Sequence, residues 1–356
     1  MNAIPSPDTA TTEVLFEKRG RLGLITLNRP EAINALNHTM VAVLQRTLDE
    51  WRHDDSVQSV LLTGSGERGL CAGGDIVSIY RDAIGGGHGS EQFWREEYML
   101  NADISTYPKP FIAIMDGIVL GGGIGLSAHS SHRIVTEHSS IGLPEVTIGF
   151  VPDVGGTYLL SRSPGQLGTH LALTAASISG ADAIEVGFAD HFVPGARIPE
   201  LIAALEHGPV NAVLARVAEE PPVSTLSSKR EWIDAAYDAD DVAEILRRLL
   251  ASPNRDANEA AATIMTKSPT ALVITLASLL RAAALPDLAA VLRQEFRVSV
   301  RMLGIPDFTE GVRAQVIDKD RAPRWRPATV REVDPRVIEV MFDELRDDEL
   351  VLHPKQ

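Results

Sequence analysis

Two glycine-rich stretches, CAGGDI at residues 71–76 and GGGIG at residues 121–125, decide the fold of this chain. Each follows a short apolar run that predicts a buried strand, Val60 to Thr63 before the first and Phe111 to Met115 before the second. Glycine lets the backbone approach a ligand closely, and free amides at a helix start favour developing negative charge. Two such amides aimed at one oxygen would form an oxyanion hole, although an isolated glycine run is more often a tight turn.

Strands and helices alternate up to about residue 200, which is typical of an α/β fold. Further strands are predicted at Leu22 to Leu27 and around Arg133 to Thr136. After Pro221 and Pro222 convincing strands are missing and apolar residues recur at helical spacing, so we predict a mostly helical C-terminal region. We therefore predict a disordered tail over residues 1–12, a core over residues 13–220 and a helical extension over residues 221–356.

The composition is that of a globular protein with an excess of acid. Hydrophobic residues make up 44% of the chain, and 33 Lys and Arg against 48 Asp and Glu give a net charge of −15. This balance argues against nucleic-acid or anionic-membrane binding, because both need a basic face. The single Cys71 excludes an internal disulfide, and no signal peptide or membrane span is visible. We expect a cytoplasmic protein.

Two carboxylates stand in apolar, glycine-containing surroundings. Glu145 follows Leu143 and Pro144, and Asp153 lies in the stretch VPDVGG at residues 151–156. Such a pair could divide acid and base roles if burial separates the two pKa values. The alternative is that both are surface acids in a chain that has many.

The order of these motifs resembles the crotonase superfamily, as does the opening LNRPEAINAL at residues 27–36. The resemblance implies a spiral of ββα units, an acyl-coenzyme A (CoA) thioester as substrate, and an oxyanion hole made by the amides of Gly74 and Gly122. It also implies that CoA lies along a few residues near the first glycine stretch: Ile33, Ala72, Gly74, Asp75 and Ile76. Members of the superfamily commonly form trimers or hexamers, so a homo-oligomer is expected.

Within the superfamily, enoyl-CoA hydratases use two glutamates. Gly125 stands at the first of these positions and Glu145 at the second, which weakens the hydratase interpretation. The 3-hydroxyisobutyryl-CoA hydrolases are more similar: they share a glycine after the triplet and the Pro-Asp-Val-Gly-Gly sequence that contains Asp153. The stretches FWREEYML at residues 93–100 and DFTEGVRA at residues 307–314 also resemble that subfamily.

The subfamily resemblance implies hydrolysis of 3-hydroxyisobutyryl-CoA, a step of valine breakdown. Glu145 would attack the carbonyl or activate a water, Asp153 would assist proton transfer, and Glu97 would bind the 3-hydroxyl. CoA would enter as part of the substrate, with no separate cofactor. We expect no metal, because His129 and His132 lack a third ligand in a recognised pattern. The alternatives are an enoyl-CoA hydratase or isomerase and a non-catalytic acyl-CoA-binding protein.

Overall fold

The computed structural model describes residues 12–352, so the tail predicted over residues 1–12 lies outside the described residues except for Thr12. The strands are β1 (Val14–Arg19), β2 (Leu22–Leu27), β3 (Ser59–Gly64), β4 (Phe111–Met115), β5 (Ile118–Leu120), β6 (His132–Val135), β7 (Ser140–Gly142), β8 (Ile178–Ser179) and β9 (His191–Phe192). The helices are α1 (His38–Arg52), α2 (Ile76–Gly85), α3 (Gly89–Ser105), α4 (Gly122–Ser127), α5 (Gly156–Leu160), α6 (Leu167–Thr174), α7 (Gly180–Glu185), α8 (Ile198–Leu205), α9 (Val210–Val217), α10 (Arg230–Tyr237), α11 (Val242–Ala251), α12 (Arg255–Ile264), α13 (Pro269–Ala282), α14 (Leu288–Met302), α15 (Pro306–Val312) and α16 (Pro335–Met341).

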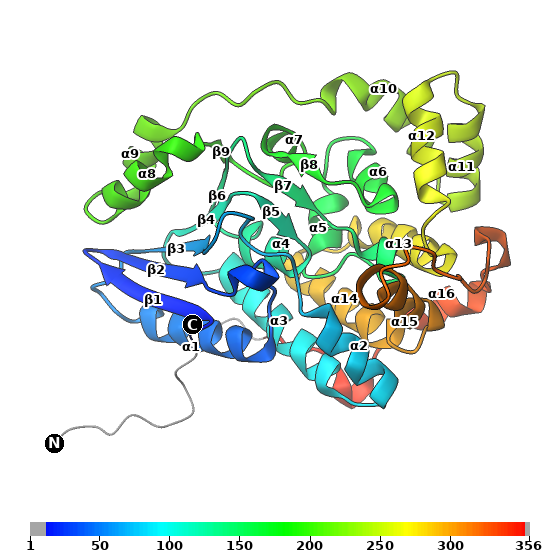
Figure 1. Cartoon of the computed structure of the whole chain (residues 1–356), viewed down its shortest axis with the longest axis horizontal. Helices are drawn as coiled ribbons and strands as arrows, with labels where there is room; N and C mark the ends of the chain where they lie inside the picture. The colour runs from blue at the N-terminus through cyan, green and yellow to red at the C-terminus, as the bar shows by residue number, and fades with distance from the viewer. Residues whose placement is uncertain (1–11, 353–356) are drawn as a thin grey trace.

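A six-stranded sheet in the order β1-β2-β3-β4-β6-β9 forms the frame of the molecule (Figure 1). β1 pairs with β2 antiparallel, and every other pairing in this sheet is parallel, with Leu24 opposite Leu61 and Val60 opposite Phe111. The predicted strands at residues 22–27 and 111–115 are confirmed at those bounds. β1 was not predicted, because its second half is charged and exposed, as suits an edge strand.

From β4 to β7, successive strands alternate between this sheet and a smaller, three-stranded sheet in the order β5-β7-β8. β4 belongs to the large sheet and β5 to the small one, and β6 and β7 repeat the step. This alternation gives the spiral of ββα units that the sequence predicts. Isolated bridges pair Cys71 with Val119 and Leu36 with Gly74, so the first glycine stretch runs beside β5, which leads into the second.

The large sheet is covered on both faces. Leu22, Leu24 and Leu61 belong to an apolar cluster with residues of α8 and α9, whereas Ile25 and Leu62 belong to the larger cluster that includes α1 and α3. Parallel strands buried on both faces read as continuous apolar runs, which explains why the central strands could be identified from sequence.

The helical character predicted for the C-terminal region is confirmed: in the described part of the chain, no strand follows β9. α14 packs against α3, and α13 packs against α5 and α6, so the late helices lie directly on the core (Figure 1). Taken singly, none of the helices described is long and apolar enough to cross a membrane. The successive pair α12 and α13 reaches that length and hydropathy only together, across a bend of 112°.

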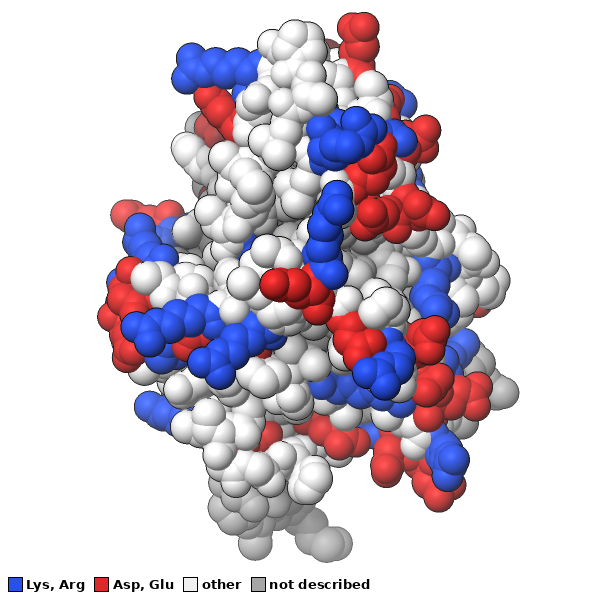
Figure 2. All heavy atoms as spheres, turned by 90° about the vertical axis from the view of Figure 1, so that its right-hand side faces the viewer, with Lys and Arg blue, Asp and Glu red and all other residues white. Residues whose placement is uncertain are grey.

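Charged side chains do not form a single-sign field on the face that Figure 2 shows. Lys and Arg lie among Asp and Glu there, and broad uncharged areas separate them. This mixed face agrees with the argument from net charge that a broad basic surface is not expected.

Candidate active site

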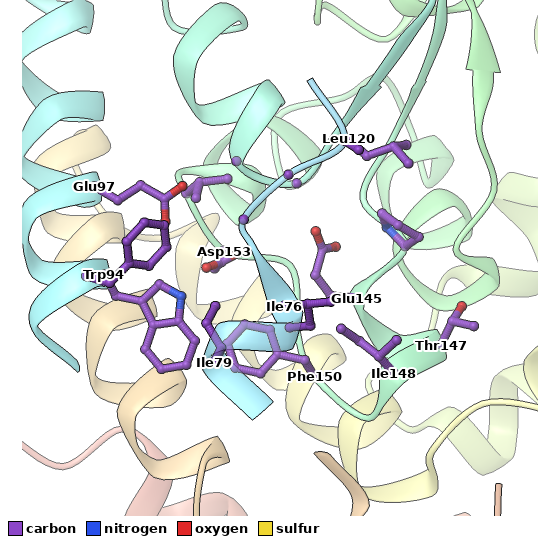
Figure 3. A pocket seen from close by; sticks show the side chains of 18 residues that line it. Ile76, Ile79, Trp94, Glu97, Leu120, Glu145, Thr147, Ile148, Phe150 and Asp153 are labelled. Carbon is purple, nitrogen blue, oxygen red and sulfur yellow. The ribbon is translucent and has the colours of Figure 1, made fainter. Parts of the chain in front are cut away.

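A cavity of about 230 Å³ lies where the two glycine stretches meet. Figure 3 shows the carboxyl groups of Glu97, Glu145 and Asp153 pointing into it, with Ile76 and Trp94 among its apolar walls. The lining residues come from the first glycine stretch with α2, from α3, from the β5–α4 turn and from residues 144–154: Ala72, Gly73, Gly74, Ile76, Ile79, Phe93, Trp94, Glu97, Leu120, Gly121, Gly122, Pro144, Glu145, Thr147, Ile148, Phe150, Asp153 and Val154.

The backbone amides of Gly74 and Gly122 are unpaired neighbours at this cavity. Leu36 donates to the carbonyl of Gly73 and accepts from Asp75, which leaves the amide of Gly74 outside this pairing. Gly122 is the first residue of α4, where an amide has no intrahelical acceptor. Within residues 12–352 neither amide donates a hydrogen bond. A Cβ on Gly122 would lie 3.4 Å from the Gly74 nitrogen and 2.5 Å from Oε1 of Glu97, so only glycine fits.

Glu145 begins a short 3-10 helix, Glu145–Ile148, at the edge of the second glycine stretch. Its Oε1 lies 3.0 Å from the point that a Cβ on Gly121 would occupy. Its Oε2 is buried and, among the described residues, has no hydrogen-bond partner. Burial, followed by the charge of Asp153, raises the pKa of Glu145 well above its usual value. A buried, unpaired carboxyl oxygen beside free amides is a group available for chemistry.

Asp153 is the strongest acid of the three cavity carboxyls. Burial raises its pKa to about 7, against the lowering effect of the Tyr98 hydroxyl, which donates to Oδ2 across 2.6 Å. The pKa of Glu97 is raised well above normal by burial first and by the charge of Asp153 second. Asp153 therefore ionises first and opposes ionisation of the other two. Burial thus separates the acidities of the predicted pair, with Asp153 the stronger acid and Glu145 the weaker.

Glu97 occupies the α3 side of the cavity and is buried. Its Oε1 has no hydrogen-bond partner in the described chain, while the adjacent Glu96 faces solvent and pairs with His38. Of the two neighbouring glutamates, the structure thus places the predicted one at the cavity.

The predicted CoA-binding residues divide into two groups. Ala72, Gly74 and Ile76 line the cavity, whereas Ile33 and Asp75 do not. The carbonyl of Ile33 accepts a hydrogen bond from the amide of Ala72 at 2.9 Å, so Ile33 supports the wall from behind. Asp75 caps the start of α2 through the amide of Ser78 and forms an ion pair with Arg29 at 3.4 Å. Its side chain therefore already has a structural role.

Three polar side chains that support the site were not anticipated from sequence: Tyr98, Glu295 and Ser299. Tyr98 holds Asp153, and Ser299 lies 2.8 Å from the Tyr98 hydroxyl. Both carboxylate oxygens of the buried Glu295 accept hydrogen bonds from the segment after Asp153, at 2.6 Å from the amide of Gly155 and 2.8 Å from that of Thr157. The available signal was that Glu295 and Ser299 fall on the apolar face of α14, where a polar residue needs a partner.

Cys71 and His129 lie near the site without reaching it. Burial raises the pKa of the Cys71 thiol to about 12, so the thiol is a poor nucleophile. Burial lowers the pKa of His129 to about 4, and its Nε2 is 2.8 Å from the carbonyl of Val154. Cys71 is fully buried and takes the place of a small apolar core residue.

Gly125 stands in a filled space. A Cβ there would lie 2.8 Å from Nδ2 of Asn101 and 2.8 Å from Cβ of Val154, closer than non-bonded atoms approach. No glutamate could be accommodated at this position without moving α3 or the Asp153 loop. The position of the first hydratase glutamate is thus closed by packing as well as by sequence.

A comparison with known proteins identifies the family. The family model for enoyl-CoA hydratase/isomerase matches residues 22–342, which is most of the chain. The protein belongs to this family, and the resemblance to the crotonase superfamily seen in the sequence is confirmed.

Individual relatives cover almost the whole chain. The mitochondrial 3-hydroxyisobutyryl-CoA hydrolase of Danio rerio is 39% identical over 96% of this chain and 92% of its own length. A solved structure described as a carnitinyl-CoA dehydratase from Mycobacterium thermoresistibile is 52% identical, with a TM-score of 0.94 over 97% of this chain and 100% of its own. An enoyl-CoA hydratase structure from Rhodobacter sphaeroides is 41% identical, with a TM-score of 0.89 over 96% of this chain and 100% of its own.

Proposed function

We propose that this protein is an acyl-CoA thioester hydrolase that cleaves 3-hydroxyisobutyryl-CoA to 3-hydroxyisobutyrate and CoA. The observation that carries the proposal is the convergence of two buried carboxyls, Glu145 and Asp153, on the free amides of Gly74 and Gly122. The likeness to a curated hydrolase over nearly the full chain supports it.

In the proposed reaction the thioester carbonyl oxygen lies against the amides of Gly74 and Gly122. These donors stabilise the negative charge that develops on the oxygen as the tetrahedral intermediate forms. Glu145 takes a proton from a water whose oxygen bonds to the carbonyl carbon. The C–S bond then breaks, and the leaving sulfur takes a proton from Asp153. Attack by Glu145 itself, giving an anhydride that water opens, uses the same groups.

The acid–base balance of the free site fits a shared proton. When the pair of Glu145 and Asp153 holds one proton, the free site keeps it on Glu145, because Asp153 is the stronger acid. The reactive arrangement has that proton on Asp153 and leaves Glu145 as the carboxylate. Both arrangements carry the same charge, so no proton needs to enter from solvent.

Glu97 is the proposed reader of the substrate's 3-hydroxyl. Its unpartnered Oε1 lies beside the position of the reacting carbonyl, 2.5 Å from where a Cβ on Gly122 would be. A substrate hydroxyl would satisfy this oxygen, whereas a non-hydroxylated acyl group would leave it buried and unpaired. Sites built to bind a hydroxyl reject analogues that lack it.

A second candidate is hydration or dehydration of an acyl-CoA, which the descriptions of the two solved relatives favour. The closed space at Gly125 opposes it, because a hydratase of the common kind needs a second glutamate there. Asp153 would have to replace that glutamate. Loss of the crotonyl-CoA absorbance on incubation with the protein would reveal this reaction.

The proposal is tested by thiol release from 3-hydroxyisobutyryl-CoA and from isobutyryl-CoA, which differ only in the hydroxyl. We expect rapid release from the first and at least about tenfold slower release from the second. The variant Glu97→Gln should lower the rate with 3-hydroxyisobutyryl-CoA much more than the rate with isobutyryl-CoA, so that the two rates become more similar. Equal rates with both thioesters would contradict the role of Glu97, and no release from either would contradict the function.

Three further expectations stay predictions. A role in valine breakdown follows from the proposed substrate. The cytoplasmic location was inferred from the sequence, while the name of the Danio rerio relative includes the word mitochondrial. A trimer or hexamer was inferred from the resemblance, and light scattering after size-exclusion chromatography would measure it.

A further inference from the structure

A buried chain of two hydroxyl groups ends on Asp153. The Tyr98 hydroxyl donates to Oδ2 of Asp153 across 2.6 Å and lies 2.8 Å from Oγ of Ser299. Tyr98 and Ser299 are each 0% exposed. The Tyr98 hydroxyl therefore has two hydrogen-bonding neighbours, Asp153 and Ser299, and a single hydrogen atom that it can donate to one of them.

The direction of such a chain depends on the protonation of Asp153. When Asp153 is ionised, Tyr98 donates to it and Ser299 donates to Tyr98. When Asp153 is protonated, its own hydroxyl donates to Tyr98, and the phenol hydrogen turns toward Ser299. A hydroxyl can donate and accept, and a helical serine can donate to the carbonyl four residues earlier. Each arrangement therefore keeps both Asp153 and Tyr98 hydrogen-bonded.

We propose that Tyr98 and Ser299 form a reversible hydroxyl pair that keeps Asp153 hydrogen-bonded in both of its protonation states. Asp153 can then hold the proton that the leaving sulfur takes, and regain it, without a buried polar group losing its partner. Tyr98 and Ser299 act through Asp153, so they are positioning residues. The inference deepens the proposed function and rests on it for the catalytic consequence, but the hydrogen-bond pair itself does not.

The hydroxyl pair matters because the titratable groups around Asp153 are all acids. The titratable groups that face Asp153 are Glu97 and Tyr98 from α3, Glu145 from the 3-10 helix at residues 145–148 and Glu295 from α14. Within residues 12–352, no Lys, Arg or His forms an ion pair with Asp153, so no cation fixes its charge. Burial and the charge of Asp153 raise the pKa of Tyr98 well above normal, so the phenol reorients without ionising.

The direct test is the titration of Asp153 by carbon NMR of protein labelled with ¹³C at aspartate carboxyls, with Asp153→Asn to assign the signal. Tyr98→Phe keeps the ring and removes only the hydroxyl. Because a hydrogen bond to the ionised carboxylate is stronger than one to the neutral acid, the pKa of Asp153 should rise by about one unit or more in the variant.

Tyr107→Phe is the matched control. Tyr107 is also a buried tyrosine, and its hydroxyl donates to the carbonyl of Leu48 at 2.8 Å, away from the cavity. The pKa of Asp153 should not move in this variant. An unchanged Asp153 titration in Tyr98→Phe, or an equal shift in both variants, would overturn the inference.

Turnover provides the second readout. We expect Tyr98→Phe to lower kcat for thiol release about tenfold and to move the inflection assigned to Asp153 to higher pH, with KM nearly unchanged. Ser299→Ala should lower kcat less, and should have no further effect in the Tyr98→Phe background because Ser299 acts only through Tyr98. Ser299→Thr, which keeps the hydroxyl, should restore the activity. If the losses in kcat of Tyr98→Phe and Ser299→Ala were additive in the double variant, the hydroxyl pair would be contradicted.

The two readouts separate the inference from the proposed function. A shifted Asp153 titration in a protein that releases no thiol would leave the hydroxyl pair standing and reject the hydrolase. Normal thiol release, with no effect of Tyr98→Phe beyond that of Tyr107→Phe, would support the hydrolase and reject the hydroxyl pair.

Discussion

The α/β core and the helical C-terminal region contribute to the cavity in different ways. The core supplies the groups that face it: the amides of Gly74 and Gly122 and the carboxyls of Glu97, Glu145 and Asp153. α14 supplies none of the lining residues, yet its Glu295 holds the Asp153 segment and its Ser299 contacts Tyr98, the hydrogen-bond donor to Asp153. The core provides the groups that line the cavity, and α14 holds the segment that carries Asp153.

The contrast suggests why the helical region lies directly on the core. The Glu295 carboxyl accepts hydrogen bonds from the amides of Gly155 and Thr157, and one from the Thr157 hydroxyl at 2.6 Å. All three donors lie just after Asp153 in the chain. A loop that carries a catalytic carboxyl must be held within a fraction of an ångström, and supporting hydrogen bonds do this. Variants of the core should therefore affect chemistry most, and variants of α14 should affect order and acidity.

The largest effect is expected for Glu145→Gln, which keeps the shape of the side chain and removes the base. Turnover should fall at least about a hundredfold, the usual scale for a positioned acid or base, with little change in stability. Thiol-release kinetics and thermal unfolding measure the two. Glu231→Gln, on the exposed surface of α10, is the control. Near-normal activity of the Glu145 variant would reject the role of Glu145.

A smaller effect on activity and a larger one on stability are expected for Glu295→Gln. The amide can accept one of the backbone hydrogen bonds but turns an N–H toward the other donor. We expect a loss of about 1–3 kcal/mol in the free energy of unfolding and about tenfold in turnover. Thr157→Val removes only the hydroxyl contact and should cost less. Chemical denaturation measures the difference, and an unchanged stability would show that Glu295 does not anchor the loop.

Stability should depend on pH in a direction fixed by the buried carboxyls. The folded-state pKa is raised for Glu145 and Glu97, to about 7 for Asp153 and to about 8 for Glu295, where burial outweighs the hydrogen bonds from Thr157 and Gly155. Stabilisation from a raised pKa is full below the unfolded value and is lost as pH rises through the folded one. The free energy of unfolding should therefore decrease from about pH 4.5 to pH 8.

The matched variant for this pH effect is Glu97→Gln, which cannot ionise. Urea denaturation at several pH values should give a flatter profile for the variant, with its largest relative stabilisation at pH 8. If stability instead rose across this range, the carboxyls of the cavity would be ionised and paired in the folded protein.

The smallest effect is expected for Lys267→Met, just before α13. Nζ of Lys267 donates at 2.9 Å to the hydroxyl of Thr147, a cavity-lining residue, and within residues 12–352 it forms no ion pair. Such a half-buried cation would suit a phosphate of CoA. We expect a severalfold higher KM for the CoA thioester and no change for a pantetheine thioester that lacks the terminal phosphates.

Lys109→Met is the control for this measurement. Among the described residues Lys109 likewise donates only to uncharged acceptors, including the carbonyl of Asp54 at 2.7 Å, and it does not line the cavity. Equal effects of Lys267→Met on both thioesters would show that Lys267 does not contact a phosphate.

The sequence predicted the parts of the molecule that short-range patterns encode. The buried strands β2 and β4 were found because apolar runs between turn residues have one interpretation, and the glycine stretches were found because their backbone requirement excludes other residues. The helical nature of the C-terminal region followed from spacing. The very short strands β8 and β9 escaped, because two residues carry no periodicity.

The side chains that support Asp153 were not predicted, for a different reason. Tyr98 and Ser299 are 201 positions apart, and nothing in either local sequence indicates that the two hydroxyls meet. Asp75 shows that a motif does not give side-chain direction: its side chain caps α2 and does not line the cavity, and its contact with CoA stays a prediction. Motifs therefore identified groups that line the cavity, whereas side-chain direction and long-range partners required the packed structure.

The most direct test of the account is one incubation of the protein with 3-hydroxyisobutyryl-CoA and another with crotonyl-CoA, following free thiol in both and the crotonyl absorbance in the second. The account predicts rapid thiol release from the hydroxylated thioester and a stable crotonyl absorbance. Loss of that absorbance without thiol release from either substrate would show that this site adds water to a double bond and that the hydrolase assignment is wrong.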